Sequence, residues 1–339
     1  MELKPLALTL PLAFTLIAAG VDAPALDKVT LGTNWVPQAE QGGYYQAVSD
    51  GTYKECGLDV TIVPGGPQVN NSAMLMAGKL TFYISGNLLV PFHAVKAGVP
   101  VVVVAADMQK DPQILMTHPG RVKDLQEIAD LPKIYIGNGG YQSFYQWLIA
   151  AWHFKAANRV PYTFSSVPFI ADENSAQQGY VTSEPYAVEK VSKLAPDVWL
   201  LADYGWDTPA TLIQTMQSTL DKHHDWVKCF VEGSAIGWAS YLYGDPTKAN
   251  ELIMKSNPEM TADQIAFAMK AMKEHGVVDS GLSLEKGIGA MSAETIQSFY
   301  DRMVRAGVVP SGLDLKKVYT LQFANTGASL PVKRKLLAQ

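Results

Sequence analysis

The segment from Leu31 to Gly66 constrains the fold of this chain more than any other. A strand is expected over Lys28–Thr33, and Asn34-Trp35-Val36-Pro37 ends it, because proline fixes its own φ and moves the preceding residue out of the helical region. Helical spacing follows from Tyr44 to Tyr53, and a second strand is expected over Leu58–Val63. This order of strand, loop, helix and strand predicts an open α/β sheet.

The loop after the first strand is the first predicted ligand-binding segment. Ligands of open α/β sheets bind beyond the carboxyl ends of the strands. We therefore expect Asn34, Trp35, Gln41 and Tyr44 to meet a small molecule. The alternative is that Trp35 and Tyr44 are only core aromatic residues.

A second polar segment follows the strand expected over Leu80–Ile84. Ser85, Gly86 and Asn87 lie at the carboxyl end of this strand. They can donate hydrogen bonds to a ligand, or simply cap the helix expected from Leu88 to Ala97.

A glycine-containing loop opens the second half of the predicted site. The chain is expected to leave the first lobe around Gln113–Thr117 and to form a strand over Lys133–Gly137. Gly139, Gly140, Tyr141 and Gln142 then precede the helix expected over Phe144–Ala157. Glycines before a helix let backbone N–H groups approach an anion or a carbonyl oxygen, although a tight turn is the alternative.

Composition limits the classes of protein to which the chain can belong. Its 339 residues suit two lobes of ordinary size, and its 48% hydrophobic content is enough to bury two cores. A formal net charge of −5 argues against a nucleic-acid surface, which needs a basic patch. No nucleophile elbow, P-loop, dinucleotide-binding glycine motif or HExxH zinc motif is present in the sequence.

The amino-terminal segment has the pattern of a secretory signal. Lys4 gives the positive region, Leu6–Ala19 the apolar stretch and Val21-Asp22-Ala23 the cleavage site, so residues 1–23 are expected to be removed and the protein to be periplasmic. A retained anchor is the rival interpretation. Cys56 and Cys229 are the two cysteines; they can pair in an oxidising compartment or remain two separate thiols.

Several motifs carry a resemblance to a known family. Asn34-Trp35-x-Pro37, Gly43-Tyr44-Tyr45 and the run from Gly57 to Gly65 resemble the thiamine-pyrimidine-precursor binding proteins and synthases. These are type II periplasmic binding proteins, related to alkanesulfonate- and nitrate-binding proteins. The resemblance extends through Ala77–Phe82 and more loosely to about Gly327.

The resemblance implies an α/β fold of two lobes. Each lobe is expected to have a central mixed sheet flanked by helices, and two crossings of the chain are expected to form the hinge. The expected division is 24–115 for the first lobe, 116–204 for the second and 205–339 for a helical return to the first. Tyr204 lies at the predicted return crossing, near the cleft or packed in the hinge.

The resemblance also supplies the charged candidate. A strand is expected over Thr163–Val167 and a short helix over Asn174–Gly179, followed by a strand over Tyr180–Tyr186 that ends in a polar turn. This stretch resembles the family element Gly-Tyr-x-x-x-Glu-Pro, whose acid can meet the ligand, so Glu184 and Tyr186 are site candidates. A carboxylate near aromatic rings suits an amino-substituted heteroaromatic or another cationic or hydrogen-bond-donating ligand; an exposed acid that caps a helix is the alternative.

The function implied by the resemblance is solute binding for an ABC importer. The expected protein is a monomer without cofactor, metal or enzymatic activity, and its partners are a membrane permease and the permease's ATPase. A thiamine-precursor pyrimidine is the first ligand expected, with riboflavin, sulfonate, nitrate and aromatic acids open. A pyrimidine-precursor synthase and a ligand sensor for a receptor are the alternatives, and the cysteine-rich motif of the eukaryotic synthases is missing here.

Overall fold

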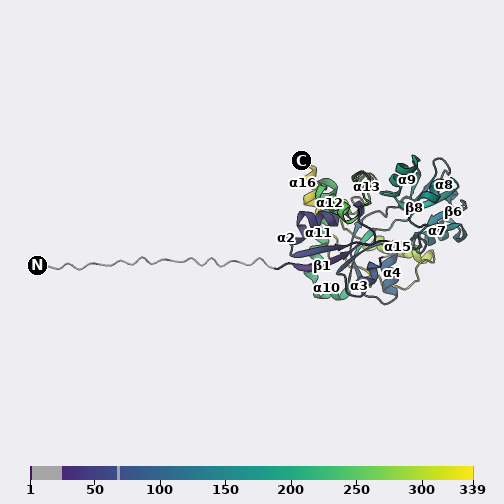
Figure 1. Cartoon of the computed structure of the whole chain (residues 1–339). Coiled ribbons are helices and arrows are strands. Elements are labelled where there is room, and N and C mark those ends of the chain that lie inside the picture. The colour runs from purple at the N-terminus through teal and green to yellow at the C-terminus, as the bar shows by residue number, and fades with distance from the viewer. Residues whose placement is uncertain (2–24, 67–68, 339) are drawn as a thin grey trace.

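The computed structural model describes residues 1, 25–66 and 69–338, so the predicted signal segment lies outside the described residues. Two five-stranded mixed sheets organise the chain (Figure 1). We name the parts built on them the first and the second lobe. In Figure 1, α7, α8 and α9 surround β6 and β8 of the second lobe, whereas α11, α12 and α16 lie with β1 of the first.

The first sheet has the order β2-β1-β3-β10-β4. β1 pairs in parallel with β2 and β3, and β10 is antiparallel to β3 and β4. The strands are β1 (Asp27–Gly32), β2 (Leu58–Val63), β3 (Phe82–Asn87), β4 (Val101–Met108) and β10 (Ala210–Met216).

The second sheet repeats this arrangement in the order β7-β6-β8-β5-β9. β6 is parallel to β7 and β8, and β5 is antiparallel to β8 and β9. The strands are β5 (Gln113–Thr117), β6 (Lys133–Ile136), β7 (Arg159–Pro161), β8 (Ser175–Tyr180) and β9 (Asp197–Leu200). In each sheet, the antiparallel strand is the one that the chain enters directly from the other lobe.

Helices cover both sheets. Those of the first lobe are α1 (Gly42–Asp50), α2 (Thr52–Glu55), α3 (Asn71–Met76), α4 (Leu89–Lys96), α10 (Gln217–Lys222), α11 (His224–Tyr243), α12 (Thr247–Ser256), α13 (Ala262–Glu274), α14 (Ser283–Lys286), α15 (Ala293–Arg305) and α16 (Ser329–Leu337), with 3₁₀ turns η1 (Ala39–Gln41) and η4 (Leu315–Lys317). Those of the second lobe are α5 (Leu125–Ile128), α6 (Asn138–Tyr141), α7 (Phe144–Trp152), α8 (Val167–Ala171) and α9 (Glu184–Ser192), with η2 (Ala156–Asn158) and η3 (Leu201–Tyr204).

The sequence predictions for the second lobe are partly wrong. Gln113–Thr117 was expected to be the crossing but is a strand of the second sheet, so the chain crosses at residues 109–112. The segment expected to be a helix over Asn174–Gly179 is β8, and the segment expected to be a strand up to Tyr186 is the start of α9. The expected strand Thr163–Val167 lies after β7 and runs into α8.

Residues 109–112 and 205–209 form the hinge, because each leaves one sheet and enters the other. The two crossings are bonded to each other: Trp206 Nε1 donates to Asp111 Oδ2 at 2.8 Å. The Trp206 ring is fully buried and packs against Trp147 of the second lobe and Phe299 of α15. The hinge is therefore packed into an apolar cluster that continues into both lobes.

The pair of glycines at the start of α1 is needed for packing between helices. A Cβ on Gly43 would overlap the Trp238 ring, and one on Gly42 would overlap Tyr241. Both aromatic residues lie on α11, which packs along α1. These glycines permit close approach of the two helices and position the loop that precedes α1.

Candidate functional site

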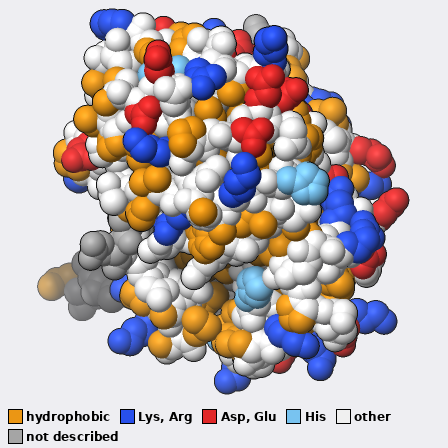
Figure 2. All heavy atoms as spheres, turned by 90° about the vertical axis from the view of Figure 1, so that its right-hand side faces the viewer, with side chains coloured by type: hydrophobic (Ala, Val, Ile, Leu, Met, Phe, Trp, Pro, Cys, Tyr) orange, Lys and Arg blue, Asp and Glu red, His pale blue; other side chains and the backbone are white. Residues whose placement is uncertain are grey.

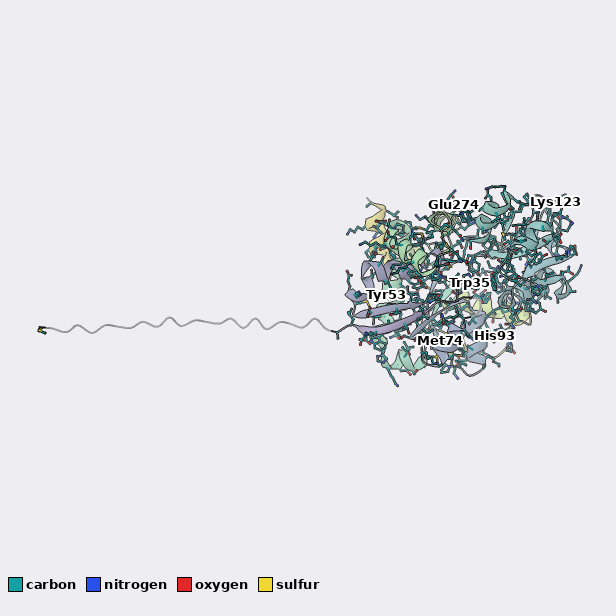
Figure 3. The ribbon with its side chains drawn as sticks, in the orientation of Figure 1. Trp35, Tyr53, Met74, His93, Lys123 and Glu274 are labelled. Atoms are coloured by element: carbon teal, nitrogen blue, oxygen red, sulfur yellow. A yellow bond between two sulfur atoms is a disulfide. The ribbon has the colours of Figure 1, made fainter. Side chains whose placement is uncertain are left out.

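Loops from both sheets meet where the two lobes contact each other. The Trp35 ring from the loop after β1 lies 5.0 Å from the Phe164 ring, which follows β7 of the second lobe. Thr182 Oγ1, after β8, donates a hydrogen bond to Glu40 Oε1 of η1. We call the loops 33–41, 162–166 and 180–184 the interlobe junction. Figure 3 shows Trp35 between Tyr53 of the first lobe and Lys123 of the second.

Hydrogen bonds fix the loop that carries Trp35. Thr33 Oγ1 donates to Trp35 O at 2.7 Å and accepts from Gly65 N at 2.8 Å. A Cβ on Gly65 would overlap Thr33 O, so a side chain there would push this loop away. Asn257 Nδ2 donates to Pro37 O at 2.9 Å from the other side. Trp35 is half-buried and Asn34 lies against Gly86, so both residues remain at the junction.

Tyr44 corrects the prediction that placed it at the ligand. Its side chain is fully buried in the first lobe, with rings of Phe230 and Trp238 at 6.4 Å and 6.0 Å. Its hydroxyl donates to Asp107 Oδ2 at 2.5 Å. Tyr44 is therefore a core aromatic residue, which was the alternative interpretation, because no part of its ring reaches the surface of the junction.

Three more predicted residues have structural partners. Gln41 Oε1 accepts from Gln38 N at 2.9 Å and closes η1. Ser85 is fully buried in β3, and its Oγ accepts from Gln214 Nε2 at 2.5 Å. Asn87 Oδ1 accepts from Leu89 N at 3.1 Å, which is the helix-capping alternative. These bonds occupy polar atoms that were expected to bind a ligand.

The glycine-containing loop is a single helical turn, α6, in place of an open loop. Gly137 N donates to Gln178 Oε1 at 2.7 Å, and a Cβ on Gly140 would contact Gln178 and the Phe144 ring. Gly139 and Gln142 are exposed, and the Tyr141 ring lies 5.1 Å below the Arg159 guanidinium. Close packing against β8 thus explains Gly140.

Glu184 begins α9 and is half-buried. Its Oε2 accepts from Tyr180 N at 2.6 Å. Burial raises the pKa of Glu184 to about 7, and the nearby charge of Glu40 adds to the shift. Burial also raises the pKa of Tyr162, with a further contribution from Glu184. The Glu184 carboxyl therefore lies against the backbone of its own segment, partly shielded from water.

Tyr186 and Tyr204 lie to the side of the junction. The Tyr186 ring packs 5.3 Å from Phe267 of α13, so it joins the lobes. Tyr204 packs against Trp152 and Trp199 at 5.8 Å and 6.4 Å. It also lines a cavity of about 360 Å³ together with Val181, Leu200, Phe267 and Lys270. This cavity shares only Tyr204 with the predicted site residues, so it is an adjoining space behind the segment 181–185.

Sequence reasoning missed Glu40, Thr182 and Phe164. Glu40 is the only charged residue in the loop 33–41, which is a signal that could have been used. Thr182 lies two residues before Glu184 and carried no separate signal. Phe164 has φ 65°, a left-handed conformation that is strained for a bulky residue. Nothing in the sequence around Phe164 predicts that conformation.

Two further properties of the described residues bear on function. None of the helices within residues 25–66 and 69–338 is both long and apolar enough to cross a membrane. Among the same residues, no group of three or more His, Cys, Asp and Glu side chains could hold a metal ion. Basic and acidic side chains are interspersed over the face seen in Figure 2.

Solved structures share this fold at low sequence identity. The periplasmic aliphatic sulphonate-binding protein SsuA from Escherichia coli is 16% identical, with a TM-score of 0.61 over 88% of this chain and 94% of that one. The periplasmic nitrate-binding protein NrtA from Synechocystis PCC 6803 is 13% identical, with a TM-score of 0.63 over 93% and 92%. A Candida albicans protein described as having the generic periplasmic binding protein fold is 16% identical, with a TM-score of 0.63 over 88% and 97%.

The sequence comparisons are consistent with the resemblance noted from the motifs. No curated protein sequence matches the chain significantly. The model of the family described as NMT1/THI5 like matches residues 38–249. This range includes Glu40, both hinge crossings and Glu184. The chain therefore belongs to the NMT1/THI5-like family and has the two-lobed α/β fold of the periplasmic binding proteins.

Proposed function

We propose that this protein is the periplasmic solute-binding component of an ABC importer and holds one small molecule at the interlobe junction. The observation that carries the proposal is the contact of Trp35 with Phe164 and of Glu40 with Thr182, each between opposite lobes. A molecule bound there touches both lobes, so it favours the closed arrangement over the open one. The permease and its ATPase are the partners that this function requires.

The lobes in this proposal follow the sheets. The first comprises residues 25–108 and 210–338, and the second comprises residues 113–204, with the two hinge segments between them. Two crossings that are bonded to each other suit a hinge motion. The fold of SsuA and NrtA, whose names state that they bind a sulphonate and nitrate, supports the solute-binding role.

The chemistry of the junction favours a heteroaromatic ligand with amino groups, such as a thiamine-precursor pyrimidine. Trp35 and Phe164 offer ring surface for stacking, and Glu184 offers a carboxyl group that accepts hydrogen bonds when ionised. Sulfonate and nitrate are anions, and Glu40 and Glu184 disfavour them. An enzymatic synthase would need a lysine at the site. In the described part of the chain, no lysine forms a hydrogen bond or ion pair with Trp35, Phe164, Glu40 or Glu184.

Export to the periplasm is supported by two features. The amino-terminal sequence has the pattern of a secretory signal. Cys56 and Cys229 form a disulfide within the first lobe, which suits an oxidising compartment.

The test is a melting-temperature screen of the purified protein with aminopyrimidines, flavins, sulfonates and aromatic acids. A ligand at one hundred times its Kd should stabilise the fold by about 2.7 kcal/mol. We expect an aminopyrimidine to do so, and Glu184→Gln to weaken amino-bearing ligands selectively. Stabilisation by a sulfonate or nitrate would overturn the ligand class and keep the binding role; no stabilisation by any class would count against the binding role.

A further inference from the structure

Helix α13 lies where the first lobe meets the second, outside the interlobe junction. In Figure 1 it stands between α12 of the first lobe and α9 of the second, and it contacts both helices. One row of its side chains, Ile265, Ala268 and Met272, is buried in the main apolar cluster of the protein. Because residues three and four apart share one face of a helix, this row is the face that anchors α13.

A different face of α13 is directed toward the second lobe. It lines the cavity of about 360 Å³ with four residues at helical spacing, Phe267, Lys270, Ala271 and Glu274. The facing wall is formed by apolar side chains of the second lobe, namely Val181, Pro185, Val198 and Leu200. The lobes therefore meet here through apolar surfaces that do not fill the space between them.

An aromatic contact joins the lobes beside this cavity. The Tyr186 ring of α9 lies 5.3 Å from the Phe267 ring, and both rings are half-buried. Lys190 Nζ lies 5.3 Å from the centroid of the Tyr186 ring, on the same helix. Aromatic pairs at this distance are attractive, so the pair favours the arrangement that keeps α9 beside α13.

The cavity limits how strongly α13 holds the second lobe. Side chains that line a void lose the dispersion contacts that a close-packed interior provides. Ala271 places the smallest side chain on the α13 wall, and only 5% of its surface is exposed. The contact therefore favours the observed arrangement of the lobes less than a filled contact would.

We propose that Phe267 and Ala271 of α13, with Tyr186 of α9, form an interlobe latch that sets the balance between the open and the closed lobes. The latch rests on the proposed function, in which the lobes are closed when the loops of the interlobe junction touch. It lies outside that junction, so it changes ligand affinity without touching the ligand. When only part of the protein is closed, the apparent affinity is reduced by that fraction.

The distance between the lobes tests the latch without a ligand. Spin labels at Lys123→Cys and Lys222→Cys, exposed positions of the second and the first lobe, report this distance by double electron–electron resonance. Labelling without reductant keeps the disulfide between Cys56 and Cys229. The affinity for hydroxymethylpyrimidine, the thiamine-precursor pyrimidine, is measured on the same variants without labels.

Two substitutions on α13 should act in opposite directions. Phe267→Ala removes the aromatic pair and should lower the ratio of closed to open protein about three- to tenfold. Ala271→Leu fills part of the cavity and should raise this ratio about threefold or more. Ala266→Leu, the same change at an exposed position of the same helix, is the matched control and should leave the ratio unchanged.

The two measurements cover both possible starting balances. If the open form predominates in the wild type, the change in the ratio appears in full in the hydroxymethylpyrimidine affinity. If the closed form predominates, the change appears in the distance distribution. The melting temperature of each variant identifies a loss of folding, which Ala271→Leu is expected to avoid because it adds apolar contacts.

The outcomes separate the latch from the proposed function. If Phe267→Ala and Ala271→Leu shift neither measurement, or shift both in the same direction, the latch is wrong. The binding role then still stands, provided that the wild type binds a member of the ligand panel. If the distances shift in opposite directions but no member of the panel binds, the packing of α13 controls the lobes and the proposed function is wrong.

Discussion

At the scale of single residues, the aromatic contact between the lobes distinguishes a proposed binding residue, Trp35, from a core residue, Tyr44. Trp35 and Tyr44 have similar predicted roles but different surroundings. Tyr44 is surrounded by the first-lobe core and bonded to Asp107, whereas Trp35 is half-buried and reaches Phe164 of the other lobe. Sequence alone cannot separate them, because the helix that carries Tyr44 can turn either face toward the sheet.

Trp35→Ala should weaken ligand binding by more than about tenfold with little loss of stability, because the ring contributes stacking at the junction and not core packing. Tyr44→Phe is the matched comparison, since it removes only a buried hydroxyl and should lower the unfolding free energy by about 1 kcal/mol. Binding and chemical unfolding are measured on both. A large fall in melting temperature of Trp35→Ala with unchanged affinity would show that Trp35 belongs to the core.

Asp107 is a buried acid that the binding proposal does not use. It lies in β4, fully buried, with Oδ2 bonded to Tyr44 and Oδ1 without a hydrogen-bond partner among the described residues. Burial raises the pKa of Asp107 to about 7, although the hydrogen bond from Tyr44 opposes the shift. The native state thus holds a proton that the unfolded chain releases near pH 4.

The stability supported by this proton is fully present below about pH 4 and is lost as the pH rises to about 7. Asp107→Asn should remove that part of the pH dependence, since the amide still accepts from Tyr44 but does not ionise. Urea unfolding between about pH 4 and about pH 8 should therefore show the variant gaining on the wild type by on the order of 4 kcal/mol, because the native and unfolded pKa values of Asp107 differ by about three, and a difference of one is worth about 1.4 kcal/mol. Parallel profiles would contradict the assignment, and exposed Asp225→Asn is the control.

At the scale of elements, helices and strands with a strong local sequence pattern were predicted well, and those with a weak pattern were not. Leu58–Val63 is a strand with the predicted bounds, because it is rich in β-branched residues and its apolar residues Leu58, Val60 and Ile62 alternate with polar ones. Thr261 caps α13, since its side chain accepts a hydrogen bond from Gln264 N. At both places, the local sequence alone is enough to specify the element.

The errors around Glu184 arise from tertiary structure. Ser175–Tyr180 contains alanine and two glutamines, which favour helix, yet it pairs with β5 on one side and β6 on the other. Hydrogen bonds from two neighbouring strands outweigh that local preference. A strand was expected over Tyr180–Tyr186, whereas Pro185 occupies the first turn of α9, where its missing N–H is tolerated.

The disulfide joins two elements of the first lobe. Cys56 ends α2 and Cys229 lies in α11, 173 residues further along the chain. The sequence left pairing open because it depends on how these elements pack. Since a cross-link restricts the unfolded chain, reduction should lower the unfolding free energy by about 2–4 kcal/mol.

Chemical unfolding with and without reductant measures this effect. The Cys56→Ser/Cys229→Ser variant is the control, because it has no disulfide and its unfolding free energy should be the same with and without reductant. Ligand affinity should stay the same, since neither cysteine lies in the interlobe junction. An unfolding free energy that does not change on reduction would contradict the stabilising role.

At the scale of the whole molecule, the order of the strands explains how one chain makes two lobes with one junction. Each sheet receives its antiparallel strand directly from the other lobe, so the two crossings lie side by side and are joined by Trp206 and Asp111. The two-lobed class was predictable from the motifs. The pairing of Glu40 with Thr182 was not, because it depends on the relative position of two lobes that share no local sequence.

The measurement that tests the binding role most directly is native mass spectrometry of the protein purified under non-denaturing conditions from cells that export it. The account predicts one small molecule bound per chain, lost in Trp35→Ala and retained in Asp225→Asn. A bound aminopyrimidine or related planar cation would support the ligand class as well. A protein that carries no small molecule, and gains none when the aminopyrimidine panel is added, would contradict the account.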